Sequence, residues 1–308
     1  MLEVVRRARF LDPKLFTAFA AAAELENFTR AAQVARMTQS GVSQHVAKLE
    51  EQVGRPLFRR AGNKVGLTHA GKALLKYLRG QVADLDAFFD VLEAEEATLS
   101  GVVTYAMPPS CLFSDHFEQL LAKRVKQPRL RLKVTLASSA EVVDLVLQSA
   151  VDFGFVTLRP ESPSIRFGSF CTEEYLLVTS SAEQATTMKA GDLFEHAVIK
   201  YPGADVYYDA WIRHFLPDES RDGRSLSFAG EINSLDGAMT MAQSGLGVAV
   251  FPRHCVQKQL DQGRLHAVEI GSVRPLLNTI YVARHADVRL PRRVTQVIDW
   301  LYDIVERK

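Results

Sequence analysis

The spacing of apolar residues changes once along the 308-residue chain, and this change limits the folds available to it. Residues 12–96 place apolar side chains three and four positions apart, as in helices, around one short hairpin-like stretch. After Ser100 and Gly101, short apolar runs typical of strands alternate with helical segments. The sequence therefore predicts a helical N-terminal region, a hinge at Ser100 and Gly101, and an α/β region.

Four residues are placed to cap helices in the N-terminal region. A helix is expected to begin at Pro13 with Asp12 as its N-cap and to end near Asn27. Short helices are expected over residues 29–36, with Thr29 as cap, and over 39–52, with Thr38 as cap and Gly54 as terminator. A long helix capped by Thr68 is expected to run to about residue 96.

The two short helices with their tight turn form a helix-turn-helix. In the second helix Val42, Val46 and Leu49 recur at helical spacing and face inward, so the opposite face is polar. That face carries Gln39, Ser40, Ser43, Gln44 and Lys48. Amides and short hydroxyls suit base edges in the major groove, and Lys48 and Arg30 suit phosphates. The alternative is an ordinary solvated helix face.

A β-hairpin is expected over residues 56–68. Apolar residues flank a basic tip that contains glycine, and Arg59, Arg60 and Lys64 lie on or near this tip. Such a wing can lay cations along the sugar-phosphate backbone.

The charge distribution supports a nucleic-acid partner for this region. Residues 1–75 hold twelve basic and six acidic side chains, a net charge of +6, whereas the whole chain carries +1. A basic head on an acidic body suggests that the head binds a polyanion. An uneven surface charge without function is the alternative.

The long helix carries an apolar seam with alternating steps of four and three. Its members are Leu74, Leu78, Gln81, Leu85, Phe88 and Leu92. A heptad seam favours pairing with a second helix, so we interpret it as a dimerisation coiled coil. The alternative is a helix that packs against the core of its own chain.

Several segments together resemble the LysR-type transcriptional regulators. The resemblance rests on residues 28–35, 38–50, 54–58 and 67–71, in this order and spacing, and it continues weakly at 174–178 and 244–252. It implies a winged helix-turn-helix over residues 1–68, a linker helix and hinge over 69–101, and an effector-binding domain over 102–308.

The effector domain that this resemblance implies is similar to the periplasmic binding proteins. It would have two α/β lobes joined by two crossover strands, with lobe I at about 102–160 and 270–308 and lobe II at about 161–269. The resemblance also implies a homodimer or a tetramer built from two dimers, an interrupted inverted repeat of double-stranded DNA as target, and RNA polymerase as a further candidate partner.

Strands and helices alternate in the second half, which predicts α/β layers with largely parallel sheets. Strands are expected at residues 102–106, 130–136, 153–156, 176–178, 198–200, 226–229, 248–251, 268–270 and 279–283. Helices are expected at residues 113–125, 140–149, 206–215, 235–244 and 291–306.

Ligands of two-lobed α/β folds bind near strand C-termini and helix N-termini, where backbone N–H groups favour anions. The candidate effector residues at such positions are Met107, Ser110, Cys111, Ser138, Ser139, Thr157, Thr172, Asn233, Ser234 and Phe251. Ser110, Ser139 and Ser234 are the most closely tied to mechanism, since each can cap a helix aimed at the cleft; a purely structural cap is the alternative. Together they predict a small polar or carboxylate-bearing effector.

Other classes of function find less support. The three cysteines, Cys111, Cys171 and Cys255, form no CxxC pair, and redox control would need an exposed thiol of low pKa. The histidines show no metal spacing, so neither a metal nor another cofactor is expected. The absence of a nucleophile elbow, a P-loop and a dinucleotide fingerprint argues against an enzyme. A DNA-binding architectural protein that needs no ligand remains a further alternative.

The sequence also bears on location. No apolar run approaches the roughly 18 residues that a membrane helix needs, so no membrane partner is expected. The basic residues of 1–10 are followed by no apolar stretch, which argues against a signal peptide. Scattered cysteines fit a reducing, cytoplasmic setting.

Overall fold

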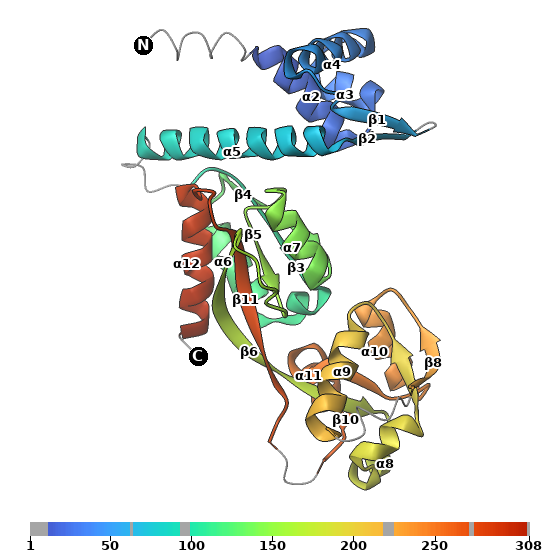
Figure 1. Cartoon of the computed structure of the whole chain (residues 1–308). Helices are drawn as coiled ribbons and strands as arrows, with labels where there is room; N and C mark the ends of the chain where they lie inside the picture. Colours follow the sequence, from blue (N-terminus) through green and yellow to red (C-terminus); the bar gives the residue numbers. More distant parts are fainter. Residues whose placement is uncertain (1–11, 62–63, 93–98, 218–224, 271–273, 307–308) are drawn as a thin grey trace. The chain divides into compact units, whose positions relative to one another are not determined.

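The computed structural model describes residues 12–61, 64–92, 99–217, 225–270 and 274–306 (Figure 1). The chain divides into two compact units, an N-terminal unit within residues 1–95 and a C-terminal unit that takes up most of residues 96–308. Within the described residues, no helix is both long enough and apolar enough to cross a lipid bilayer.

The N-terminal unit is a helical bundle with a two-stranded hairpin. Its elements are α2 (Pro13–Leu25), α3 (Phe28–Ala35), α4 (Gln39–Val53), β1 (Phe58–Ala61), β2 (Lys64–Leu67) and α5 (His69–Leu92). Alanines at the contacts of α2 with α3 and α4, among them Ala18, Ala22 and Ala31, are fully buried and let these helices approach closely. Leu15, Phe19 and Leu57 belong to a second cluster, which packs the start of the hairpin against α2.

Most of the expected helix boundaries are confirmed. Asp12 and Thr38 are the N-caps of α2 and α4, and Gly54 closes α4 in the left-handed conformation with φ 72°. The expected cap of α3 is wrong, because Asn27 rather than Thr29 occupies that position. The Asn27 side chain accepts a hydrogen bond from the Arg30 N–H at 3.0 Å, and α3 begins one residue later.

The hairpin and the start of α5 are locked together. β1 and β2 pair antiparallel, with Phe58 opposite Leu67. The Thr68 hydroxyl then donates to the Pro56 carbonyl at 2.8 Å and accepts from the Gly71 N–H at 3.1 Å, so Thr68 caps α5 as expected. A Cβ atom at Gly71 would lie 2.1 Å from the Leu57 carbonyl oxygen, so this close approach requires glycine.

The C-terminal unit contains nine described strands and nine described helical segments. The strands are β3 (Gly101–Met107), β4 (Leu130–Leu136), β5 (Phe153–Val156), β6 (Ile165–Thr179), β7 (Ala197–Lys200), β8 (Ser227–Glu231), β9 (Ala249–Pro252), β10 (His266–Ala267) and β11 (Leu277–His285). The helices are η1 (Pro109–Phe113), α6 (Asp115–Val125), α7 (Ser139–Leu147), α8 (Ala182–Thr187), η2 (Ala190–Phe194), α9 (Ala204–Phe215), α10 (Leu235–Gln243), α11 (Arg253–Asp261) and α12 (Arg292–Glu306).

The sheets are mixed rather than largely parallel, which corrects the expectation from the sequence. The main sheet has the order β10-β6-β11-β5-β3-β4, and β9 also pairs with β6. Only the β3–β4 and β3–β5 pairs of this sheet are parallel, whereas β11 and the long β6 run antiparallel to their neighbours. The small β7–β8 sheet is parallel.

The strand β6 passes from one lobe of this unit to the other. Its residues 165–174 pair with β11 beside β5, and its residues 175–179 pair with β9 and β10 (Figure 1). Lobe I then packs its core around β3, β5 and α7, and lobe II packs a larger core around β7, β9, α9 and α10. The first part of β6 escaped the sequence analysis, because its apolar residues do not alternate regularly with polar ones.

Smaller boundary errors have local causes. The strands over 130–136 and 153–156 are confirmed, whereas the one expected at 268–270 is wrong, since β10 ends at Ala267. The helix expected from residue 113 begins at Asp115, because the 3₁₀ turn η1 precedes it. Helices α8 and α11 were not expected.

Candidate functional site

The polar face of α4 lies on the surface of the N-terminal unit. Val42, Val46 and Leu49 are buried against α2 and α3, at no more than 4% exposure. This burial fixes the rotation of α4 about its own axis and leaves the predicted base-reading side chains outside the core. Gln39, Ser40, Gln44 and Lys48 are exposed and Ser43 is half-buried. Arg30 on α3 is exposed as well.

The N-terminus of α4 is fixed by short hydrogen-bonded contacts. The Thr38 hydroxyl accepts from the Gly41 N–H at 3.0 Å and lies 3.1 Å from the Ser40 hydroxyl. One turn further, His45 Nδ1 lies 2.7 Å from the Gly41 carbonyl oxygen, which accepts its proton. The His45 ring therefore bonds to its own helix, and the glutamines and serines remain the polar groups available at this face.

Glu50 anchors the start of the wing, a role that the sequence analysis missed. Its Oε1 atom accepts from the backbone N–H groups of Leu57 and Phe58 at 2.6 Å and 3.1 Å. The carboxylate thus ties the C-terminal part of α4 to the strand that begins the hairpin. The sequence shows only an acidic pair, Glu50 and Glu51, ahead of Leu57, and spacing alone does not tell which of the two carboxylates turns toward the wing.

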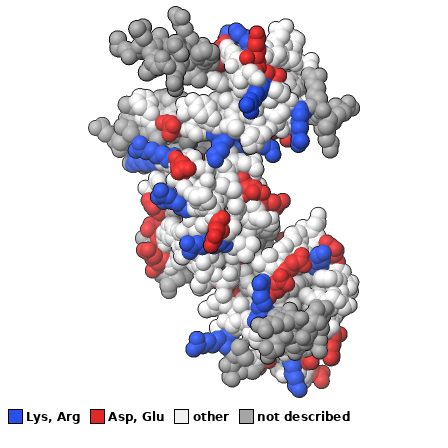
Figure 2. All heavy atoms as spheres, viewed as in Figure 1, with Lys and Arg blue, Asp and Glu red and all other residues white. Residues whose placement is uncertain are grey.

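The basic residues of the wing are described only in part. Arg59 is exposed on β1, whereas the side chains of Arg60 and Lys64 lie outside the described residues. On the face seen in Figure 2, Lys and Arg side chains alternate with Asp and Glu over both units. On this face the described cations of the N-terminal unit therefore lie among acidic side chains (Figure 2).

The apolar seam of α5 divides into two parts. Leu74 and Leu78 are partly buried against the core of their own unit. Leu85 and Phe88 are 54% and 56% exposed, and Val82 next to them is 60% exposed. The side chain of Leu92 lies outside the described residues. The seam thus serves the unit's own core at its start and leaves large apolar side chains in solvent further along.

A cavity of about 300 Å³ lies between the two lobes. The parallel strands β3, β4 and β5 end on one side of it, so the residues that follow them meet at one edge of the sheet. Ser138, Ser139 and Thr157 line the cavity on this side, and the segment from Pro202 to Tyr207 lines it from lobe II. Three of the ten candidate effector residues thus converge at one cavity.

The hydroxyl groups at this cavity form a connected set. Ser139 Oγ accepts from the Thr157 N–H and lies 3.0 Å from Thr157 Oγ1. The Ser138 N–H and hydroxyl both donate to Glu141 Oε2 at 2.8 Å, which lowers the pKa of that carboxyl group. Ser138, rather than Ser139, caps α7, because its Oγ atom accepts from the Glu141 N–H at 3.3 Å.

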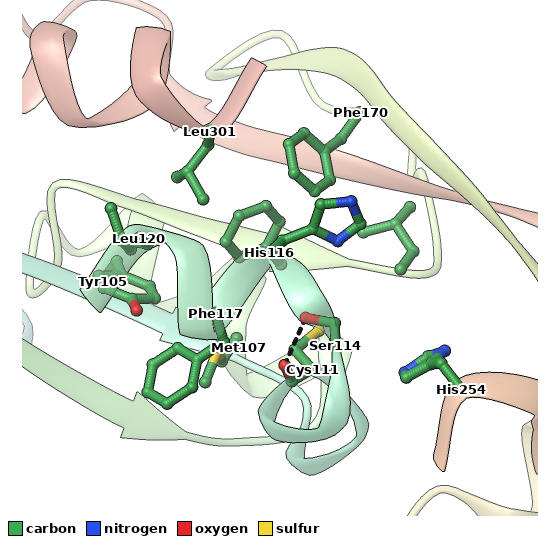
Figure 3. Close-up of a pocket in the computed structure, with 12 residues that line it drawn as sticks. Tyr105, Met107, Cys111, Ser114, His116, Phe117, Leu120, Phe170, His254 and Leu301 are labelled. Atoms are coloured by element: carbon green, nitrogen blue, oxygen red, sulfur yellow. Dashed lines mark hydrogen bonds between the residues drawn. The ribbon is translucent and has the colours of Figure 1, made fainter. Parts of the chain in front are cut away.

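Met107 and Cys111 line a second, much smaller cavity, whose walls come mostly from lobe I (Figure 3). Its accessible volume is about 20 Å³, and its walls are mostly apolar, with Tyr105, Phe155 and Phe170 among them. His254 points toward it from α11 of lobe II. Space of this size holds about one water molecule.

The remaining candidate effector residues line neither cavity. Ser234 caps α10 through the Gly237 N–H at 3.3 Å, which is the structural alternative. Ser110 lies within the short turn η1 and caps no helix, so that expectation is wrong; its hydroxyl is buried. Phe251 is fully buried in the lobe II core, while Thr172 and Asn233 are exposed.

The cysteines and histidines give no sign of redox or metal chemistry in the described residues. None of the three cysteines forms a disulfide within the described residues, and burial raises the pKa of the Cys111 and Cys255 thiols, which keeps these two protonated and unreactive. No cluster of three or more His, Cys, Asp or Glu residues suited to a metal occurs within the ranges that the structure describes.

Comparison with known proteins matches both units to one family. Residues 13–72 match "Bacterial regulatory helix-turn-helix protein, lysR family", and residues 97–305 match "LysR substrate binding domain". A relative, the uncharacterised HTH-type transcriptional regulator YxjO of Bacillus subtilis (strain 168), is 25% identical over 258 residues, which is 84% of this chain and 86% of the relative.

Solved structures share the fold. A full-length OxyR variant from Pseudomonas aeruginosa has a TM-score of 0.73 at 17% identity, and the match covers 96% of this chain and 95% of that one. Full-length CbnR in complex with its target DNA has a TM-score of 0.60 at 18% identity, with 95% of this chain and 99% of that one covered.

The chain therefore belongs to the LysR-type transcriptional regulators. It is a DNA-binding transcription regulator with an N-terminal helix-turn-helix and a C-terminal effector-binding α/β domain. This confirms the resemblance, the fold class and the broad function predicted from the sequence. Because the family consists of regulators, the prediction that the chain is not an enzyme is also confirmed.

Replacing Glu50 by alanine tests its role as the wing anchor. Two backbone N–H groups near the buried Leu57 lose a charged acceptor, so the free energy of unfolding should fall by about 1.5–3 kcal/mol. Urea unfolding of the full chain measures this, and DNA affinity should fall with it. Glu51→Ala removes the neighbouring exposed carboxylate and is the control. Equal losses in the two variants would contradict the anchor.

Proposed function

We propose that α4 enters the major groove of an operator and that the wing follows the adjacent backbone. The observation that carries this proposal is the exposed row of amides, hydroxyls and one lysine on α4, opposite its buried apolar stripe. Gln39, Ser40, Ser43 and Gln44 read base edges, while Arg30, Lys48, Arg59, Arg60 and Lys64 contact phosphates. Residues 1–68 form this DNA-binding domain.

The regulator works as a homodimer, or as a tetramer built from two dimers, on an interrupted inverted repeat. The support is the exposed apolar row of Val82, Leu85 and Phe88 in the linker helix and hinge region, residues 69–101. Rows of large apolar side chains in solvent mark interaction surfaces. Two copies of α4 then meet two half-sites, because the symmetry of the operator mirrors that of the protein.

The regulator is proposed to act in the cytoplasm. RNA polymerase is its proposed protein partner in transcription.

A small polar or carboxylate-bearing effector binds between the lobes of residues 102–308 and changes the DNA contacts. The support is the cavity of about 300 Å³, whose size suits a metabolite, and its set of hydroxyl groups from Ser138, Ser139 and Thr157. Glu141 already occupies the Ser138 N–H and hydroxyl at the N-terminus of α7, so the hydroxyl groups of Ser139 and Thr157 are the groups proposed to contact the ligand there.

Two substitutions in α4 separate base reading from phosphate binding. On a duplex selected by the wild-type protein from a random pool, Gln39→Ala should reduce discrimination against altered bases by about 1–3 kcal/mol. Lys48→Ala should weaken binding to all sequences and lower the salt slope by about 1. Fluorescence anisotropy over a range of salt concentrations measures both effects, with the exposed Lys133→Ala of the other unit as control. A Lys48→Ala slope equal to the control would contradict the phosphate contact.

Charges placed in the exposed part of the seam test the dimer. The double variant Leu85→Asp, Phe88→Asp loses two large apolar side chains in each copy, and so four in a dimer interface. Each lost side chain removes about 1.5–3 kcal/mol of binding free energy, so the dimer should dissociate to monomers. Light scattering after size exclusion measures the mass. Lys72→Glu with Lys76→Glu alters the opposite side of α5 and should leave the mass unchanged. An unaltered dimer in the Asp variant would exclude this interface.

Filling the cavity tests the effector site. Metabolites that bind it should raise the melting temperature of the full chain by about 5–10 °C at a hundredfold excess over Kd. Ala140 lines the cavity and is exposed, so Ala140→Trp should abolish this shift while DNA affinity is retained. Ala182→Trp, at the exposed start of α8, is the control. A metabolite whose shift survives Ala140→Trp binds elsewhere and would contradict the cavity as its site.

A further inference from the structure

A buried carboxyl group lies where the two lobes meet. Glu173, on the crossover strand β6, is 5% exposed. Its Oε1 atom accepts from the Tyr175 hydroxyl at 2.9 Å and from Asn278 Nδ2 on β11 at 3.3 Å. Its Oε2 atom has no hydrogen-bond partner and faces Nδ1 of His254 at 4.0 Å. A buried ionised oxygen without a partner is costly, so this atom calls for a proton or a cation.

The Nε2 atom of His254, on the side of the ring away from Glu173, determines which ring nitrogen carries the proton. Nε2 is 3.0 Å from the Ser110 carbonyl oxygen, which can only accept, so Nε2 carries a hydrogen. In a neutral imidazole Nδ1 then carries a lone pair, and this lone pair would face the Glu173 carboxylate. Two acceptors would oppose each other in a buried site. One proton on either Glu173 Oε2 or His254 Nδ1 removes this conflict.

The surroundings of Glu173 favour retention of that proton. The titratable groups near it are Tyr175 on its own strand, Tyr207 on α9, Cys111 on η1, and His254 and Cys255 on α11. Burial first, and proximity to Glu173 second, raises the pKa of Tyr175, Tyr207, Cys111 and Cys255, so these groups stay neutral and bring no positive charge to the carboxyl group. Burial raises the pKa of the Glu173 carboxyl itself. Arg253, next to His254, is paired with Glu174 and so does not neutralise Glu173.

The same residues connect the lobes to the effector cavity. Ser110 belongs to η1 of lobe I, while His254 and Cys255 belong to α11 of lobe II, and the Cys255 thiol also points to the Ser110 carbonyl oxygen at 3.7 Å. The Tyr175 ring packs edge-on against Tyr207, with 4.8 Å between the ring centroids. Tyr207 in turn lines the cavity. A ligand that moves Tyr207 therefore also affects Tyr175, whose hydroxyl donates to Glu173.

We propose that Glu173 and His254 hold one proton between them and form a pH-sensitive latch that joins the lobes beside the effector cavity. The regulatory role of this latch rests on the proposed effector function. With the proton in place, the pair is either neutral or an ion pair, and α11 stays against η1. Loss of the proton leaves an uncompensated buried carboxylate, and the contact between the lobes weakens.

The direction of the pH dependence follows from proton counting. Below the unfolded-state pKa of a glutamate, about 4.3, both states are protonated and Glu173 costs the fold nothing. An unfolded glutamate releases its proton at about pH 4.3 and an unfolded histidine at about pH 6.5, so from neutrality upward the unfolded chain holds neither proton while the folded pair retains one. The folded state then binds more protons than the unfolded state. Stability of the C-terminal unit therefore falls as pH rises, until the folded pair has also lost its proton.

Thermal unfolding of the full-length protein between about pH 5 and about pH 8 tests the latch. The melting temperature of the wild type should decline with rising pH, by about 3–5 °C for each unit by which the pair raises the carboxyl pKa, and Glu173→Gln should lack this decline. Glu174→Gln removes the adjacent, partly exposed carboxylate that pairs with Arg253, and its curve should run parallel to that of the wild type. Parallel curves for all three proteins would overturn the proposal.

Nuclear magnetic resonance of the wild type supplies a second readout, which does not depend on the folding of any variant. Labelled Glu carboxyl carbons and His ring nitrogens report which atom carries the proton. At neutral pH we expect either a protonated Glu173 or a doubly protonated His254. An ionised Glu173 beside a neutral His254 would refute the shared proton.

Neither the thermal unfolding nor the magnetic resonance experiment uses DNA or an effector. A negative result in these two experiments therefore leaves the proposed regulatory function standing, and a negative result in the effector tests leaves the shared proton standing.

Discussion

The burial of three apolar side chains of α4 determines what the N-terminal unit can offer to another molecule. Val42, Val46 and Leu49 pack against α2 and α3, and the helical repeat then places glutamines, serines and Lys48 on the free side. The carboxylate of Glu50, on the same helix, holds the first strand of the wing. One packed helix thus orients both elements with which the protein is proposed to contact a duplex.

In the C-terminal unit the comparable constraint is the strand β6, which both lobes share. Because it pairs with β11 in lobe I and with β9 and β10 in lobe II, its midpoint is held at the lobe junction. Glu173 lies at that midpoint, and the ends of the parallel strands β3, β4 and β5 lie at the edge of lobe I. The polar groups at the cavity and the buried carboxyl group therefore come together from segments far apart in the sequence.

Local patterns predicted the local features well. The caps at Asp12, Thr38 and Thr68 and the polar face of α4 follow from residue type and helical spacing, which need no tertiary information. The cap at Asn27 was misplaced because two residues with suitable side chains stand close together, and only packing decides between them. Leu74 and Leu78 likewise satisfy a heptad pattern, yet they serve their own core.

Features that depend on distant contacts were beyond the sequence. The direction of β11, the passage of β6 between lobes, and the unpartnered Oε2 atom of Glu173 arise only when remote segments pair.

The central claim, that α4 reads the major groove, is tested most directly by methylation protection of guanine N7 atoms on a duplex selected by the protein. The account predicts protection of guanines in two symmetric half-sites. Tight binding that leaves every major-groove N7 reactive would contradict it.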